Sequence, residues 1–129
     1  LVPYVYINDT VHKTRGFLIA SGNIAGEKMH FIVNHWPSRA AASPARERAG
    51  EQVRAIKDSL LREDSAAKIV IMGDMNDDPM DKSMAVALGA KRKPADVGPT
   101  DLYNPWWDTL KKGYGTLMYK GKWNLFDQI

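Results

Sequence analysis

The sequence contains no cysteine among its 129 residues. Disulfide scaffolds, thiolate zinc sites and cysteine nucleophiles are therefore excluded as explanations of its fold or chemistry. It also lacks any apolar run near the ~20 residues that a membrane-spanning helix needs, so we expect no membrane span within the chain. A strong excess of one charge is missing as well. Eighteen basic and 15 acidic residues give a net charge of +3, which allows a polyanionic ligand without requiring one.

The two ends of the chain lack the usual terminal signals. The sequence begins Leu1-Val2-Pro3, with neither an initiating methionine nor a leader-like segment, and it stops at Ile129 within a strand-like run. Both ends predict a chain cut from a longer domain. Because a leader would precede residue 1, the sequence assigns no localisation.

The first third of the chain predicts a β-hairpin. Two β-rich runs, residues 16–20 and 29–33, are separated by residues 21–27, which contain two glycines and an asparagine. Residues 1–7 alternate weakly around a proline and predict an edge strand.

Ser43 is predicted as the N-cap of a helix, with Pro44 as its first helical residue. Its apolar residues recur at the spacing of one helix face: Ala45, Ala49, Val53, Ile56 and Leu60. The opposite, charged face includes Arg46 and Lys57, and we interpret it as solvated. The apolar run 68–73 that follows predicts a strand buried on both faces.

This order of strand, helix and strand predicts a βαβ unit. Its two strands would run parallel, so their carboxyl ends meet at one edge of the sheet, where open α/β sheets bind ligands. Further along, residues 81–88 predict a short helix stopped by Gly89, and residues 90–105 predict a loop. Residues 115–119 and 123–127 predict a second hairpin, with Trp123 in the core.

The stretch 72–79 (MGDMNDDP) directly follows the buried strand. Attack of water on phosphorus needs an acceptor to orient or deprotonate the water and a neutral donor to hold developing charge. Asp74 and Asn76 supply these groups two residues apart. The alternative is an Asx-rich turn that caps the next helix. An EF-hand loop is rejected, because Pro79 and Ala85 replace its required glycine and glutamate.

Residues 34–39 (NHWPSR) lie at the equivalent end of the preceding strand. His35 can protonate a leaving group or hold a phosphate oxygen, and Arg39 can clamp a phosphate. Asn34 and Arg39 are the candidates for substrate contact. A histidine beside a tryptophan is more often a packing residue, but its position across the sheet from Asp74 favours the functional interpretation.

Three segments resemble, in order, motifs of the endonuclease/exonuclease/phosphatase superfamily, the deoxyribonuclease I-like group. They are residues 34–39 (NHWPSR), 73–77 (GDMND) and 123–129 (WNLFDQI). The resemblance implies an α/β (α+β) fold, as part of a four-layer αββα sandwich. It also implies a phosphoesterase that cleaves a phosphate ester by water attack, with Mg²⁺ as its metal and Mn²⁺ or Ca²⁺ as alternatives.

The resemblance implies a role for each matching residue. Asp74 would orient or activate the attacking water, and Asn76 would contact the scissile phosphate. His35 would act near the leaving group, and Asp127 would orient a second histidine from a later Ser-Asp-His segment. Asp74 and Asn76 are also expected as ligands of a second metal site. The glutamate that binds the principal ion in the family has no match in this chain.

The resemblance further predicts that residues 1–129 form the middle-to-late portion of one such domain. The chain by itself is then expected to be inactive, with the remainder of the domain as its necessary partner. The substrate would be a phosphate ester: a nucleic acid, a phospholipid head group or a small phosphodiester. The alternative is a non-catalytic domain that binds a phosphate-bearing ligand or nucleic acid on the same scaffold.

Overall fold

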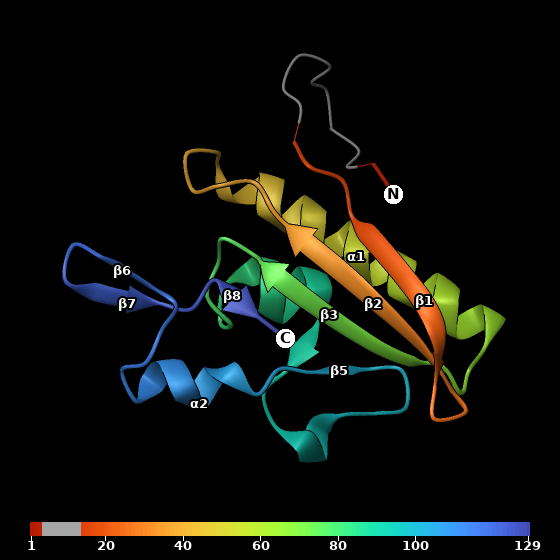
Figure 1. The fold of residues 1–129 in the computed structure, drawn as a ribbon. Coiled ribbons are helices and arrows are strands. Elements are labelled where there is room, and N and C mark those ends of the chain that lie inside the picture. Colours follow the sequence, from red (N-terminus) through yellow and green to blue (C-terminus); the bar gives the residue numbers. More distant parts are fainter. Residues whose placement is uncertain (4–13) are drawn as a thin grey trace.

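The computed structural model describes residues 1–3 and 14–129. Most of the edge strand expected at residues 1–7 lies outside the described residues, although Val2 forms an isolated antiparallel bridge with Phe17. The centre of the molecule is a four-stranded sheet in the order β1-β2-β3-β8, with one long helix, α1, packed along it (Figure 1).

The elements follow one another in this order: β1 (Leu18–Ile24), β2 (Glu27–His35), α1 (Ser43–Glu63), β3 (Lys68–Asp74), the π-helical η1 (Ser83–Leu88), β4 (Ala90–Lys91), the 3-10 helix η2 (Pro94–Asp96), β5 (Leu102–Tyr103), α2 (Trp106–Lys111), β6 (Leu117–Tyr119), β7 (Lys122–Asn124) and β8 (Asp127–Gln128). Strands β4 and β5 form one small two-stranded sheet and β6 and β7 another. Within the described residues, no helix has the length and apolarity to cross a membrane.

The first hairpin is confirmed, with longer strands than predicted. All of β1 pairs antiparallel with residues 27–33 of β2, and the turn takes two residues, Ala25 and Gly26. Both have positive φ, 51° and 81°, as in the turns that match the twist of antiparallel strands. The predicted loop 21–27 is therefore mostly strand.

The βαβ unit is also confirmed. Strands β2 and β3 run parallel, and α1 lies in the crossover between them. Gly73 makes their close approach possible near the carboxyl ends, since a Cβ at this position would lie 2.0 Å from the Asn34 carbonyl oxygen. Its φ of +130° also disfavours any residue with a side chain.

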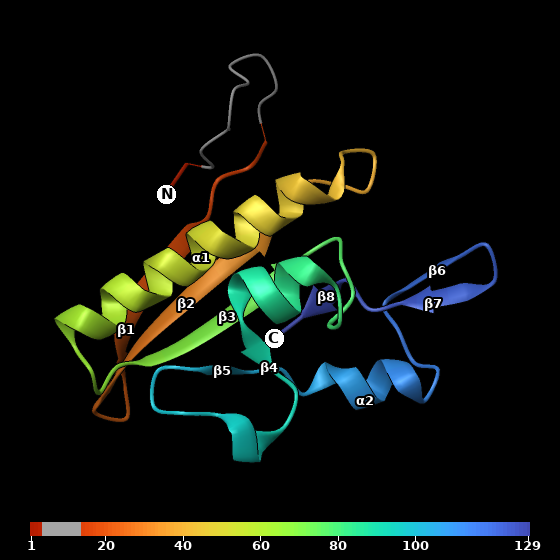
Figure 2. The ribbon, with the colours of Figure 1, turned by 180° about the vertical axis from the view of Figure 1, so that it is seen from behind.

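Helix α1 buries more charge than its sequence suggested. Ala49 and Val53 enter the core as predicted. The interpretation of the charged face as solvated is wrong for Arg46 and Lys57, which are each 5% exposed. Figure 2 shows η1 beside α1 on this side of the sheet, and Arg46 pairs with Asp77 in the loop that leads to η1.

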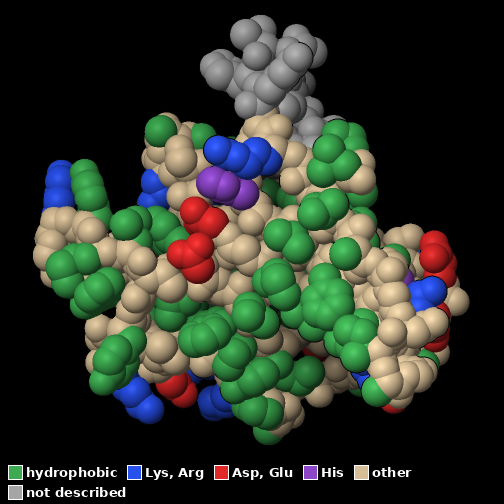
Figure 3. Space-filling model, viewed as in Figure 1, with side chains coloured by type: hydrophobic (Ala, Val, Ile, Leu, Met, Phe, Trp, Pro, Cys, Tyr) green, Lys and Arg blue, Asp and Glu red, His purple; other side chains and the backbone are tan. Residues whose placement is uncertain are grey.

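The two faces of the main sheet differ in their cover. Ile32 and Ile71 face α1 and belong to the core. The opposite face carries apolar side chains that include Leu18 and Val33, 51% and 36% exposed. Figure 3 shows hydrophobic side chains gathered over this face, with a histidine and acidic side chains near its upper edge. The polar edge of this open face is where the predicted site residues lie.

The last third of the chain is confirmed in part. Helix η1 ends at Gly89, which has the left-handed backbone expected of a terminating glycine. Strands β6 and β7 form the predicted hairpin, but the ladder stops at Asn124 and β8 joins β3 in the main sheet. The prediction that Trp123 is a core residue is wrong, because its position in the projecting hairpin leaves it 40% exposed.

Candidate active site at the carboxyl edge of the sheet

Three predicted residues form one row across the sheet. His35 at the end of β2 is the register partner of Asp74 at the end of β3, and Asp74 is the register partner of Asp127 in β8. Register partners point to the same face of a sheet, so the three side chains share the open face. His35 Nε2 lies 3.7 Å from Asp74 Oδ2. This is too long for a hydrogen bond and suits an ion pair when the imidazole is protonated.

Asn76 is held beside Asp74 by a tight turn. The Asn76 backbone N–H donates to Asp74 Oδ1 at 2.9 Å, and Asn76 has the positive φ, 52°, that asparagine tolerates well. The side-chain nitrogen donates to the Trp36 carbonyl at 3.0 Å. An amide nitrogen carries two N–H groups, so a second donor remains for a ligand. This is an Asx turn, the local structure considered above as an alternative, and it brings the Asp74 and Asn76 side chains together.

Asn34 lies apart from this group. Its side chain is buried, and Nδ2 donates to the carbonyls of Ile32 and Met72 at 2.8 and 3.1 Å. Its Oδ1 accepts the Trp36 indole N–H at 3.0 Å. These bonds fasten the ends of β2 and β3 to Trp36, a use that the sequence pattern did not indicate.

Arg39 reaches the same edge, but acidic groups surround it. Its Nη2 lies 2.9 Å from Asp81 Oδ2 and 3.4 Å from Asp78 Oδ2, and its Nε lies 3.4 Å from Asp77 Oδ1. The Nε group also donates to the Asn76 carbonyl at 3.1 Å. The guanidinium is therefore engaged with the loop that follows β3.

Beneath this loop lies a buried polar cluster centred on Asp77. Arg46 Nε lies 2.8 Å from Asp77 Oδ1, and the Ser83 hydroxyl donates to Asp77 Oδ2 at 2.7 Å. Burial raises the pKa of Asp77, and the Ser83 hydrogen bond and the Arg46 charge only partly offset that effect. Gln128 Nε2 donates to the Asp77 carbonyl at 2.8 Å. The sequence analysis did not predict this cluster. The three further acids after Asp74, at positions 77, 78 and 81, were the pattern that could have indicated it.

The exposed oxygens of the row fit part of a divalent-cation site. Asp74 and Asp127 stand opposite each other on neighbouring strands, where like charges disfavour pairing unless a cation is near. Carboxylate and amide oxygens of the kind that Asp74 and Asn76 offer are the ligands Mg²⁺ prefers. Among the described residues, no group of three or more His, Asp or Glu side chains is arranged to hold an ion. The fit is therefore partial.

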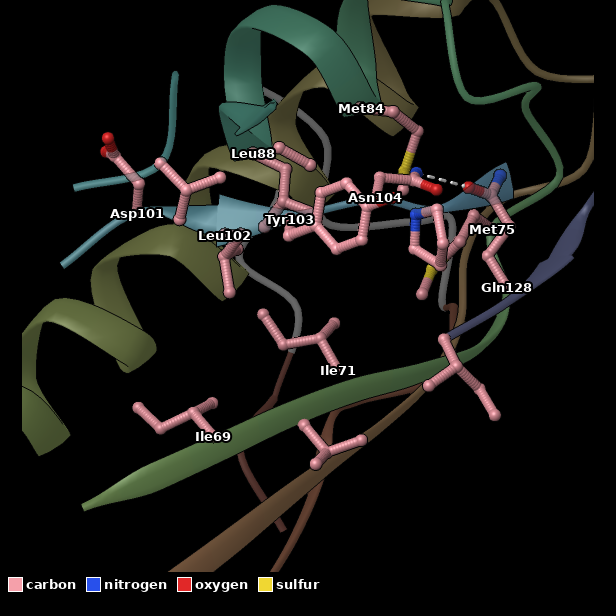
Figure 4. A pocket seen from close by; sticks show the side chains of 15 residues that line it. Ile69, Ile71, Met75, Met84, Leu88, Asp101, Leu102, Tyr103, Asn104 and Gln128 are labelled. Carbon is pink, nitrogen blue, oxygen red and sulfur yellow. Dashed lines mark hydrogen bonds between the residues drawn. The ribbon is translucent and has the colours of Figure 1, made fainter. Parts of the chain in front are cut away.

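A separate apolar pocket of about 390 Å³ lies behind this edge, between β3, η1 and residues 101–105. Figure 4 shows Ile69, Ile71 and Leu102 around it, with Asn104 donating to Gln128 at its rim. The pocket does not contain His35, Asp74 or Asn76. It lies on the α1 side of the sheet, apart from the candidate site.

A family model described as the endonuclease/exonuclease/phosphatase family matches residues 2–129. The chain belongs to this family. The match covers all three of the motifs, at residues 34–39, 73–77 and 123–129.

Solved structures similar to this family member include sphingomyelinase C from Streptomyces griseocarneus. The two chains are 26% identical, with a TM-score of 0.51 over 63% of this chain and 30% of that one. SmcL is 20% identical, with a TM-score of 0.50 over 87% and 41%. TDP2 from D. rerio, solved with a single-strand DNA product, is 20% identical, with a TM-score of 0.52 over 92% and 47%.

The chain spans less than half the length of each of these structures. Comparison with curated proteins found no match. The structural likenesses confirm the predicted fold class, an α/β sandwich of the deoxyribonuclease I-like type. The roles of His35, Asp74, Asn76 and Asp127 stay predictions.

Proposed function

We propose that this chain carries part of the active site of a divalent-cation-dependent phosphoric ester hydrolase. The row of His35, Asp74 and Asp127 beside Asn76 supports this proposal most directly. An acceptor, an amide donor and an imidazole converge at the carboxyl edge of two parallel strands, in a member of the endonuclease/exonuclease/phosphatase family.

Each side chain then has a defined task. The Asp74 carboxylate orients a water and accepts its proton, and the second N–H of Asn76 donates to a phosphate oxygen. His35 carries a proton toward the leaving oxygen. A divalent cation, Mg²⁺ in the first place, would be held by Asp74 and Asn76 and would neutralise phosphate charge when bound. Asp127, the register partner of Asp74, borders the site and would orient a second histidine.

We propose a phosphodiester as the substrate class. The similar S. griseocarneus protein is a sphingomyelinase, which supports a phosphodiester without identifying the group it carries. Bis(p-nitrophenyl) phosphate tests the chemistry, while sphingomyelin vesicles and a single-stranded oligonucleotide distinguish a lipid from a nucleic acid.

The decisive variant is Asp74→Asn in the protein that contains this chain. It removes the acceptor and keeps the shape of the side chain, so we expect hydrolysis with Mg²⁺ to fall by about 10²–10⁴-fold. Circular dichroism and the melting temperature should stay unchanged. Asp96→Asn, at an exposed acid in η2, is the matched control and should retain full activity. EDTA should abolish hydrolysis and Mg²⁺ should restore it.

Near-normal hydrolysis by Asp74→Asn would contradict the proposal. A wild-type protein that hydrolyses none of the three substrates, yet binds the oligonucleotide or inorganic phosphate, would favour the non-catalytic binding domain instead. Residues 1–129 by themselves are expected to turn over little substrate, because the described residues offer an incomplete set of metal ligands.

A further inference from the structure

Arg39 joins three separate segments of the chain at the candidate site. It belongs to the loop after β2, and its Nε donates to the Asn76 carbonyl in the loop after β3. Its Nη1 donates to Asn124 Oδ1 at 3.4 Å, and its guanidinium lies 4.5 Å from the centre of the Phe126 ring. Each segment adjoins a residue of the candidate site: His35 ends β2, Asp74 ends β3, and Asp127 directly follows Phe126.

The pairing that sets Asp127 against Asp74 is short. Strands β3 and β8 share two register pairs, Gly73 with Gln128 and Asp74 with Asp127. Beside this ladder, the Met75 N–H donates to the Phe126 carbonyl at 2.7 Å, and the Leu125 N–H donates to Asp78 Oδ1 at 2.7 Å. Arg39 contacts the acceptor residue of each of these two hydrogen bonds, because it stacks on Phe126 and pairs with Asp78.

The charge around Arg39 argues against a direct contact with substrate. Three carboxylates, those of Asp77, Asp78 and Asp81, lie within 3.4 Å of its guanidinium nitrogens. An anionic phosphate would have to compete with all three. A planar guanidinium suits this setting better than an ammonium, since it donates in several directions and stacks on an aromatic face at the same time.

We propose that Arg39 is a positioning residue, which holds the segment 124–127 against the loop after β3 and thereby sets Asp127 opposite Asp74. The effect of Arg39 on turnover rests on the proposed function, whereas its effect on the position of the segment 124–127 does not. We therefore use two measurements, so that a failure of the proposed function can be told from a failure of the positioning role.

The first readout is amide hydrogen exchange in the intact chain. Arg39→Gln should raise exchange at the Met75 and Leu125 amides at least tenfold and leave the central amides of α1 unchanged. Arg39→Lys keeps the charge but loses the planar contacts, so it should not restore protection. Arg62→Gln, at an exposed arginine in the last turn of α1, is the matched control and should change neither amide.

The second readout is steady-state kinetics with bis(p-nitrophenyl) phosphate and Mg²⁺. A positioning role predicts that Arg39→Gln lowers kcat about 10- to 100-fold and leaves KM within about threefold, because misplaced groups slow the chemical step. A raised KM with unchanged kcat would identify a substrate contact and overturn the proposal.

Unchanged exchange at Met75 and Leu125 in Arg39→Gln would also overturn it. If that variant loses protection throughout α1, the milder Phe126→Leu decides: selective exposure of the same two amides supports the proposal, and full protection overturns it. A wild-type protein without hydrolytic activity would remove the proposed function, and the exchange experiment would still decide the role of Arg39.

Discussion

Asp77 is a buried carboxylate next to the candidate site, and its pKa is raised because burial disfavours the charged form. A group whose folded-state pKa lies above the unfolded value of 3.8 stabilises the fold fully below that pH. The contribution is lost as the pH rises through the folded-state pKa. At neutral pH, the ion pair with Arg46 therefore offsets a burial cost rather than adding net stability.

This balance predicts an asymmetry between single and double substitutions. Asp77→Asn leaves the buried Arg46 charge without its carboxylate and should lower the free energy of unfolding by about 3 kcal/mol. The low end of the usual range is expected, because Arg46 keeps hydrogen bonds to the Ser38 and Ala41 carbonyls. Adding Arg46→Met should recover most of the loss. Urea denaturation at pH 7 measures both.

If the double variant is at least as unstable as Asp77→Asn, the ion pair between Arg46 and Asp77 does more than offset the cost of burying its charges. This result would mean that Arg46 stabilises the fold through its packing and its carbonyl contacts more than it costs through its buried charge.

At the scale of elements, the contact between α1 and η1 supports the loop that follows β3 and contains Asn76 and Asp77. Gly50 lies at the closest point: a Cβ there would lie 2.4 Å from the Ser83 carbonyl oxygen and 3.1 Å from the Ala87 Cβ. Because the Ser83 hydroxyl also bonds Asp77, any displacement of η1 reaches the buried cluster beneath the site.

Gly50→Ala should therefore destabilise the protein by about 1–3 kcal/mol, the usual cost of overpacking. Helix propensity acts in the opposite direction, since alanine favours a helix by about 1 kcal/mol over glycine. Gly22→Ala, in β1 with open space around it, is the control and should be neutral or stabilising. Urea denaturation again measures the difference. Equal effects at the two glycines would show that backbone entropy, not helix packing, dominates.

The elements that sequence could predict are those with a local signature. The hairpin, α1 and β3 each show a period or a turn signal, and the βαβ order was enough to bring His35 and Asp74 to one edge. The end of the second hairpin at Asn124 could not be predicted from the sequence, because it depends on a hydrogen bond from the Leu125 N–H to Asp78, 47 positions away. The burial of Arg46 was missed for the same reason: its partner belongs to another segment.

At the scale of the whole molecule, the described residues cover the main sheet unevenly. Helix α1 packs on one face, while the other presents apolar side chains to solvent beneath the candidate site (Figure 3). In an αββα sandwich, this second face packs against another sheet. The resemblance to the family implied that class of fold, and we expect the open face to be the place where a second sheet docks in a longer protein.

Neighbouring residues of β2 test this expectation, because Ile32 is fully buried against α1 and Val33 is 36% exposed on the open face. In the 129-residue chain, Ile32→Ala should cost about 2–5 kcal/mol, whereas Val33→Lys should cost no more than about 1 kcal/mol. In a longer protein that supplies the second sheet, Val33→Lys should become severe, since it would bury an unpaired charge. Denaturation of both proteins measures the contrast. An equal, small cost of Val33→Lys in the two would mean that no second sheet covers this face.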